Sequence, residues 1–361
     1  MTFSDNSSYF CLARNRFVIK ILLMKGNKDR KRRFFSGECI HIYQKSVNGF
    51  ILFYETEDIL ACYTMISVYS RIHNVKILEL CFMVDHIHIL ITADKPEAMA
   101  ALMRDFSSAY VLNFNSSTGR SGQLLHKSYG NAPKRGDKKV RSAIIYIGNN
   151  PVEKKICKRA EEYRWNFMPY ILKPFPYSEK RTLRHMENSI RKLCKEIQEC
   201  RNRNEYLTHD RLHRMFCGLS DRDKEFLTDF IIMKFWFLDE STMTSYFMDI
   251  KSMTEAMAST TGSEYEIHES FNPEPDTAYH EMASVIKKLF PGIPVRRIIT
   301  LPAEQKIKVF SFLKQTSSAS FSQICRFLHI EQKRSRSQTP QHQDITPTPC
   351  CNAQQGVEIK H

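Results

Sequence analysis

The first half of the chain alternates between two patterns of apolar positions, one typical of strands and one typical of helices. The period-two alternation in ECIHIYQKSV, residues 38–47, predicts a strand, and the extended piece FILFY at residues 50–54 follows a turn at Asn48 and Gly49. Thr56, with two acidic residues directly after it, predicts the start of a helix that ends near residue 73.

Three further strands and two further helices are expected before residue 160. The first two of these strands, residues 76–85 and 86–93, meet at a turn, and apolar residues recur at helical spacing from Pro96. The segment QLLHKSYG at residues 123–130 predicts a short strand, and a last helix follows a polar, basic loop. This order fits an α+β fold, in which a ferredoxin-like antiparallel sheet has helices on one face.

The second half of the chain carries the spacing of amphipathic helices. Pro169, Pro174 and Pro176 mark a boundary before it, and a polar stretch with two prolines, residues 259–277, predicts a linker or loop. The helical patterns cover residues 178–203, 207–238, 278–289, 303–315 and 320–330.

These patterns divide the chain into four expected parts. Residues 1–33 form a basic N-terminal extension that ends in KGNKDRKRR, and translation could instead begin at Met24. A sheet domain covers residues 34–170, and a mostly α-helical C-terminal domain covers residues 178–330. The tail at residues 331–361 is rich in Gln, Pro, Thr and Ser, which predicts disorder.

The last two predicted helices, within residues 303–330, resemble a helix-turn-helix across the turn TSSA. Ser320 and Gln323 fit a capping box at the start of the second helix. In a DNA-binding pair, Gln323, Arg326 and His329 would face the DNA. A plain helical hairpin is the alternative.

Composition adds the sign of the partner's charge. The chain has 53 Lys and Arg against 39 Asp and Glu, a net charge of +14, so a polyanion is expected. A ribosome or a membrane surface would suit the same balance. The eleven cysteines form no CxxC pair, which argues against a disulfide framework or a zinc site. Without a long apolar run, the chain is expected to be a cytoplasmic protein with no membrane partner.

Two short motifs carry candidate chemistry. In the strand MVDHIHILI, His86 and His88 project from the same side, because side chains alternate along a strand. In the helix that contains YIGNNP, Tyr146 and Asn150 lie one turn apart on one face. Two imidazoles and an amide oxygen suit a divalent cation, and the phenol would lie beside it. Two histidines on an apolar strand are, taken alone, more often core or surface residues.

A tyrosine beside a metal indicates phosphoryl transfer. A free tyrosine has a pKa of about 10, so only ~0.1% is phenolate at neutral pH, which handicaps it as a nucleophile by roughly 4 kcal/mol. A metal that neutralises charge on the phosphorus oxygens offsets part of that handicap. The expected intermediate is a covalent tyrosine ester.

These motifs resemble those of the HUH single-strand DNA endonucleases, in the single-tyrosine branch that holds the IS200-like and REP-associated tyrosine transposases. MVDHIHILI is similar to the histidine–hydrophobe–histidine strand, and YIGNNPVEKK is similar to the tyrosine helix. The segment FSSAYVLNFNSSTGRSGQLLHKSY is similar to the helix and strand between them. The resemblance covers residues 34–170 and makes that domain the catalytic one.

The resemblance implies a role for each motif residue. His86, His88 and Asn150 would be ligands of Mg²⁺ or Mn²⁺, and Tyr146 would be the nucleophile. The protein would nick and join single-stranded or hairpin DNA through a 5′-phosphotyrosine, in the bacterial cytoplasm and at the nucleoid. In some members the tyrosine helix acts in the partner subunit's site, which leaves a homodimer open. A catalytically silent, domesticated DNA-binding regulator is the alternative function.

Residues around the motifs complete the expected site. The family commonly has Met-Pro-Asn before the first histidine, whereas this chain has Met83-Val84-Asp85. Asp85 is therefore either a turn residue or an extra carboxylate near the metal. Polar and basic residues before the tyrosine helix are expected to contact DNA; they are His126, Lys127, Lys134, Arg135, Lys138 and Lys139.

Overall fold

The computed structural model describes residues 36–182, 186–259 and 274–332. The expected N-terminal extension, most of the expected linker and nearly all of the expected tail lie outside these ranges. The described residues up to Ile330 form one compact unit. The domain boundaries proposed from the sequence stay predictions.

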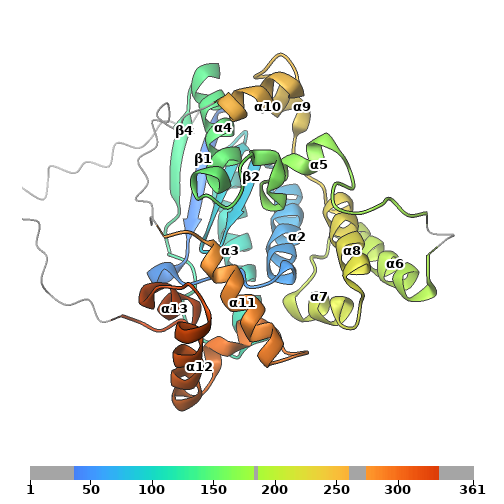
Figure 1. The fold of residues 1–361 in the computed structure, drawn as a ribbon. Helices are drawn as coiled ribbons and strands as arrows, with labels where there is room; N and C mark the ends of the chain where they lie inside the picture. The colour runs from blue at the N-terminus through green and yellow to red at the C-terminus, as the bar shows by residue number, and fades with distance from the viewer. Residues whose placement is uncertain (1–35, 183–185, 260–273, 333–361) are drawn as a thin grey trace, which may run out of the picture. The chain divides into compact units, whose positions relative to one another are not determined.

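A four-stranded antiparallel sheet lies at the centre of this unit (Figure 1). The strand order is β2-β3-β1-β4, and each neighbouring pair is antiparallel. The antiparallel sheet expected from the sequence is therefore confirmed. Its strands are β1 (Cys39–Lys45), β2 (Lys76–Met83), β3 (His86–Thr92) and β4 (Gly130–Lys134).

Strand β4 begins where the expected strand at residues 123–130 ends. Within that segment Leu125 makes an isolated bridge with Ser46, and the regular pairing with β1 starts at Gly130. The loop that was expected to be irregular therefore contains the strand. Pro133 is tolerated there because β4 is an edge strand, where a missing N–H donor leaves no neighbouring strand unpaired.

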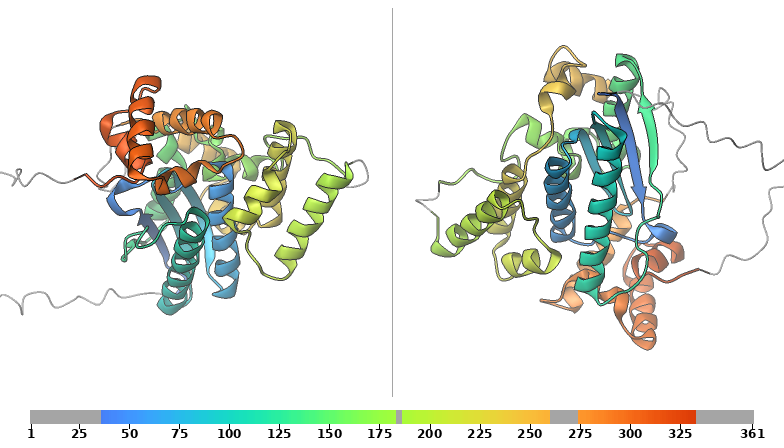
Figure 2. Two further views of the ribbon diagram at one scale, coloured as in Figure 1. Left: turned by 90° about the horizontal axis from the view of Figure 1, so that it is seen from below. Right: turned by 180° about the vertical axis from the view of Figure 1, so that it is seen from behind.

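Helices cover both faces of the sheet, whereas the sequence predicted helices on one face. Helices α2 (Thr56–Ile72) and α3 (Pro96–Thr118) pack in one apolar cluster, and α4 (Asp137–Glu153) packs in another on the opposite face (Figure 2). The reason lies in two neighbouring strands of the sheet. β3 and almost all of β2 are buried at consecutive positions, so both of their faces need cover.

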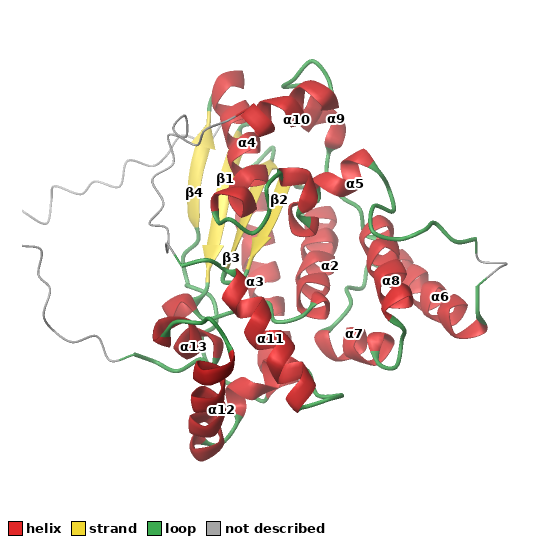
Figure 3. Cartoon of the chain, in the orientation of Figure 1, coloured by secondary structure: helices red, strands yellow, loops and turns green. Residues whose placement is uncertain are grey.

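The rest of the described chain is helical and packs around this core (Figure 3). Helices α7 and α8 contact α2, α10 contacts α4, and α11, α12 and α13 contact one another. None of the helices in the described ranges is both long and apolar enough to cross a bilayer. These later helices are α5 (Met168–Leu172), α6 (Asn188–Asn202), α7 (His209–Phe216), α8 (Asp221–Lys234), α9 (Glu240–Thr244), α10 (Ile250–Ser259), α11 (Thr277–Leu289), α12 (Ala303–Thr316) and α13 (Phe321–Phe327).

The expected helix-turn-helix is a packed helical pair. The capping box at the start of α13 is present, because Ser320 and Gln323 each bond the other's backbone N–H. Gln323 is buried and donates to the carbonyl of Pro275, and Arg326 forms an ion pair with Glu274 at 3.4 Å. The side of α13 that was expected to face DNA therefore contacts the chain's own residues. In this conformation Gln323 does not face solvent.

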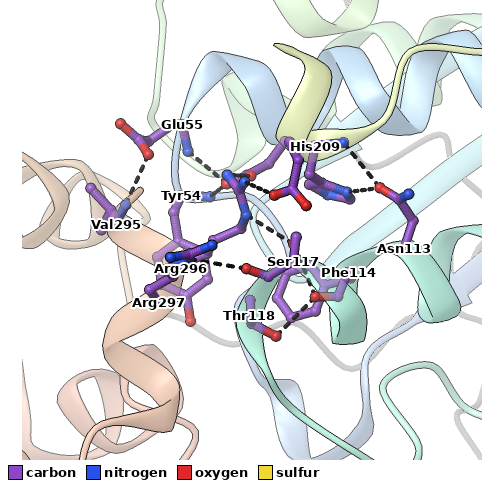
Figure 4. Close-up of polar contacts among 12 residues, drawn as sticks. Tyr54, Glu55, Asn113, Phe114, Ser117, Thr118, His209, Val295, Arg296 and Arg297 are labelled. Atoms are coloured by element: carbon purple, nitrogen blue, oxygen red, sulfur yellow. Dashed lines mark hydrogen bonds and ion pairs between the residues drawn. The ribbon is translucent and has the colours of Figure 1, made fainter. Parts of the chain in front are cut away.

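A buried ion pair attaches the C-terminal third of the chain to the sheet domain. Arg296, in the 3₁₀ segment Val295–Thr300, donates to Asp58 at 2.9 Å, and both side chains are 0% exposed. The Arg296 guanidinium also donates to Ser117 at the end of α3 (Figure 4). Asp58 in turn accepts from two backbone N–H groups at the start of α2. The pair thus connects three segments that are distant in sequence.

Replacing Arg296 should destabilise the protein much more than replacing its neighbour. Arg296→Leu leaves the Asp58 carboxylate buried without its cation, which costs about 3–5 kcal/mol. Arg297→Leu is the matched control, because Arg297 is exposed, and it should cost less than about 1 kcal/mol. Urea unfolding of both variants measures the difference. Equal losses in the two variants would show that the buried pair is not the source of the stability.

Candidate active site

The pairing of β1 with β3 brings four side chains with candidate chemistry onto one face of the sheet. Tyr43 lies opposite His88 in the antiparallel register, and His41 precedes Tyr43 by two residues on β1. His86 and His88 alternate with apolar residues, so all four side chains project from the same face. This is the face that α4 covers, as the contacts of its tyrosine show.

His88 lies at the centre of this group. Its side chain is fully buried, and its Nδ1 atom is 3.0 Å from Nε2 of His41. The ring of Tyr146, from α4, meets His88 edge-on at 5.7 Å between centroids and His41 at 5.8 Å. Burial, followed by the neighbouring His86 and His41, holds the pKa of His88 well below its usual value. His88 is therefore neutral at pH 7, as a metal-binding imidazole must be.

His86 has a carboxylate as its partner. The two motif rings lie 4.9 Å apart and nearly perpendicular, and Nδ1 of His86 is 2.6 Å from Oδ1 of Asp85. Partial burial would raise the pKa of Asp85, but the charge and hydrogen bond of His86 outweigh it and hold that pKa below its ordinary value. Asp85 is thus both a turn residue and a carboxylate directly beside the first histidine.

Asn150 has the features expected of an unsatisfied ligand. It lies one turn beyond Tyr146 on α4 and is fully buried. Among the described residues, neither its amide oxygen nor its amide nitrogen has a hydrogen-bond partner, which is costly for a buried group. The described chain has no cluster of three or more His, Cys, Asp and Glu side chains that would hold a metal. A three-ligand site here would therefore need the Asn150 oxygen, and the two imidazoles with this amide fit a divalent cation.

The site is covered in this conformation. Tyr146 is 1% exposed, because α4 lies over the sheet; α10 packs on α4, and Met243 of α9 joins Met253 and Met257 of α10 in the same apolar cluster. The Asn149 amide donates to the carbonyl of Met257 at 2.8 Å and attaches α10 to α4. The phenol is therefore shielded from solvent in this conformation.

The basic residues expected to contact DNA lie in two places. His126 and Lys127 are exposed beside a groove of about 570 Å³ that Arg104 and Tyr129 also line. The other four residues lie at the end of β4, in the connection after it and at the start of α4; they are Lys134, Arg135, Lys138 and Lys139. Burial, and then the charge of Lys134, lower the pKa of His41 to about 3, so the charge of Lys134 reaches that histidine.

Two residues have positions that the sequence did not predict. Arg326 was expected on a recognition helix, but the structure places it near Asp85. Both side chains lie beside Gly49: a Cβ atom there would be 3.5 Å from Arg326 and 3.9 Å from Asp85. His41 was not recognised as a candidate. The alternation in ECIHIYQKSV shows that it projects from one side of a strand, but the pairing with β3 is needed to place it beside His88.

Comparisons with known proteins bear on the same residues. Residues 51–150 match the family of IS200-like transposases. The resemblance expected from the two motifs is confirmed over this segment, which contains His86, His88, Tyr146 and Asn150. The match begins after β1, so it does not include His41.

A solved structure is also similar to part of the chain. It is described as the structure of a REP-associated tyrosine transposase bound to a REP hairpin, and it is 16% identical with a TM-score of 0.33. The similarity covers 41% of this chain and 87% of that one. No curated protein sequence matches the chain. The IS200-like match supports a transposase-type function.

Gly130 leaves room for an aromatic ring next to the histidines. The Tyr43 ring lies over Gly130 on β4, so closely that a Cβ atom there would be 1.9 Å from the ring carbon Cζ. Glycine at an edge strand commonly accepts such a ring. The ring of Tyr43 is also 6.1 Å from that of His41, which makes it part of the wall of the site.

Gly130→Ala should therefore displace the Tyr43 ring and lower the free energy of unfolding by about 1–3 kcal/mol, as overpacking usually does. In a Tyr43→Ala background the same substitution should cost less than about 0.5 kcal/mol, because the clash is gone. Chemical unfolding of the two single variants and the double variant measures both numbers. Additive losses would contradict the steric explanation.

Proposed function

We propose that the protein is a metal-dependent enzyme that nicks and joins single-stranded DNA with Tyr146 as its nucleophile. The observation that carries the proposal is the contact of the Tyr146 ring with the ring of His88, with Asn150 one turn away on the same helix face. The match to IS200-like transposases supports the reaction type. A folded single strand such as a hairpin is the proposed substrate; the similar solved structure is of a transposase bound to a REP hairpin.

The chemical step is a transesterification at phosphorus. The Tyr146 oxygen loses its proton and forms a bond to phosphorus, while the bond from phosphorus to the 3′-oxygen of the preceding nucleotide breaks. The leaving oxygen takes up a proton and becomes a 3′-hydroxyl, and the 5′-phosphate stays on the tyrosine. Because the ester conserves the energy of the broken bond, a 3′-hydroxyl can reverse the step and join strands without ATP.

The three proposed ligands would bind Mg²⁺ or Mn²⁺ next to the scissile phosphate. Bound there, the cation would neutralise charge on the phosphorus oxygens during attack. His86 and His88 would bind through Nε2, since the Nδ1 atoms lie against Asp85 and His41. The Asn150 oxygen would complete the set from α4.

The basic surface would bind the DNA backbone. Lys134 ends β4, Arg135 follows it, and Lys138 and Lys139 lie in the first turn of α4, the helix that also carries Tyr146. Neutralising phosphates at this position releases counterions and so strengthens binding at low salt. A homodimer, with the tyrosine helix of one subunit in the other's site, stays a prediction.

A DNA-binding regulator without cleavage is the second candidate. The observation that favours it is the complete cover over Tyr146 and Asn150. A protein that keeps the fold and its basic surface, but does not move α4, would bind DNA without reacting with it.

Removing the phenolic hydroxyl should abolish covalent attachment to DNA. Labelled single-stranded hairpins, incubated with the wild type and Mn²⁺, should give an adduct that survives denaturing electrophoresis, and Tyr146→Phe should give none. Tyr163→Phe is the matched control, because Tyr163 is a tyrosine whose hydroxyl bonds the backbone carbonyl of Phe82, and it should still give the adduct. An adduct in Tyr146→Phe would rule out Tyr146 as the nucleophile. DNA binding without any adduct in the wild type would favour the second candidate function, a regulator that does not cleave.

Removing one proposed ligand should separate cleavage from binding. His88→Ala should abolish strand cleavage while the dissociation constant for DNA changes by less than about threefold, since the basic residues remain. His73→Ala is the control, because His73 bonds Asp105 of α3 on the opposite face of the sheet. This variant should cleave normally. Cleavage assays and fluorescence anisotropy measure the two quantities. Normal cleavage by His88→Ala would exclude the proposed metal site.

A further inference from the structure

We propose that His41 is a positioning residue that fixes the ring orientation and tautomer of His88 for metal binding. The inference rests on the proposed function, in which His88 is a metal ligand. It concerns a residue outside the segment that matches the IS200-like transposases. His41 comes from β1, 47 positions before its partner on β3.

The geometry leaves His88 little freedom. The two rings are stacked, with centroids 5.2 Å apart and planes 23° from parallel, and the Nε2 atom of His41 lies 3.0 Å from Nδ1 of His88. Both side chains are buried, and the ring of Tyr146 lies against both. A rotation of the His88 ring would break the hydrogen bond inside a buried site, where an unmade bond is costly.

The direction of the hydrogen bond decides whether His88 can bind a cation. If Nδ1–H of His88 donates to His41, the lone pair of His88 is on Nε2 and can bind a metal. If His41 donates instead, the proton of His88 is on Nε2 and blocks it. In the metal-loaded protein His41 therefore accepts, with its own proton on Nδ1. It then acts on His88 as a carboxylate or carbonyl acts on many metal-binding histidines.

The neighbouring ligand has the same arrangement with a different partner. Nδ1 of His86 bonds the Asp85 carboxylate, which can only accept, at 2.6 Å. Both proposed imidazole ligands are thus held by a hydrogen bond at Nδ1, which leaves Nε2 as the atom that would bind the metal. Because His41 comes from β1 and Asp85 from the β2–β3 turn, the two ligands are oriented by independent parts of the chain.

The test measures Mn²⁺ binding to the full-length protein without DNA, by electron paramagnetic resonance of the free ion. His41→Leu removes the acceptor and should weaken Mn²⁺ binding by about 10–100-fold. His41→Gln keeps an acceptor oxygen on a side chain of similar reach and should bind within about threefold of the wild type. His209→Leu is the control for loss of a buried, hydrogen-bonded imidazole away from the site, and it should bind Mn²⁺ normally.

The outcomes separate this inference from the proposed function. If Mn²⁺ binding depends on His88 but not on His41, the positioning role is wrong and the metal site stands. If His88→Ala does not change Mn²⁺ binding, the metal site is wrong and the positioning role with it. Equal losses in His41→Gln and His41→Leu would make His41 a ligand and not a positioning residue.

A measurement on the wild type needs no variant to fold. In protein loaded with Mg²⁺ and labelled with ¹⁵N, a coupling across the N–H···N hydrogen bond should connect His88 Nδ1 with His41 Nε2, with the proton on His88. A proton on His41 Nε2, or the lack of a coupling between the two rings, would overturn the assignment.

Discussion

Antiparallel pairing between β1 and β3 is the constraint on which the site depends. It brings His41 of β1 and the two motif histidines of β3 onto one face, and α4 then places its phenol against them. A shift of the register by one residue would turn His41 toward the face that α2 and α3 cover. An imidazole there would be buried among apolar side chains without a polar partner, which is unfavourable. The apolar core and the candidate chemistry therefore require the same pairing.

Features that depend on neighbouring residues in the chain could be read from the sequence. The alternation around His86 and His88 needs only the period of a strand, and the spacing of Tyr146 and Asn150 needs only the period of a helix. The capping box at Ser320 is likewise contained in four residues, and it is present. The antiparallel sheet and the family resemblance followed from these local signals, and both are confirmed.

Features that depend on pairing between distant segments could not be read in this way. The edge strand at Gly130 is selected by β1, which is far away in the chain, and no period marks it. The position of α4 on the second face follows from the burial of both sides of β2 and β3. Gln323 has the sequence of an exposed recognition residue, but its burial is decided by contacts with the segment before α11. His41 could not be recognised for the same reason.

The cover over Tyr146 has a consequence for selectivity. With Tyr146 as the proposed nucleophile, 1% exposure means that reaction would occur only in molecules in which the site has opened, so the rate would be scaled by the population of that open state. A ligand raises this population only as far as it prefers the open form over the closed one. Short or poorly matched strands would then bind the basic surface and dissociate without being cut. Discrimination would thus arise in the opening equilibrium, before any bond is broken.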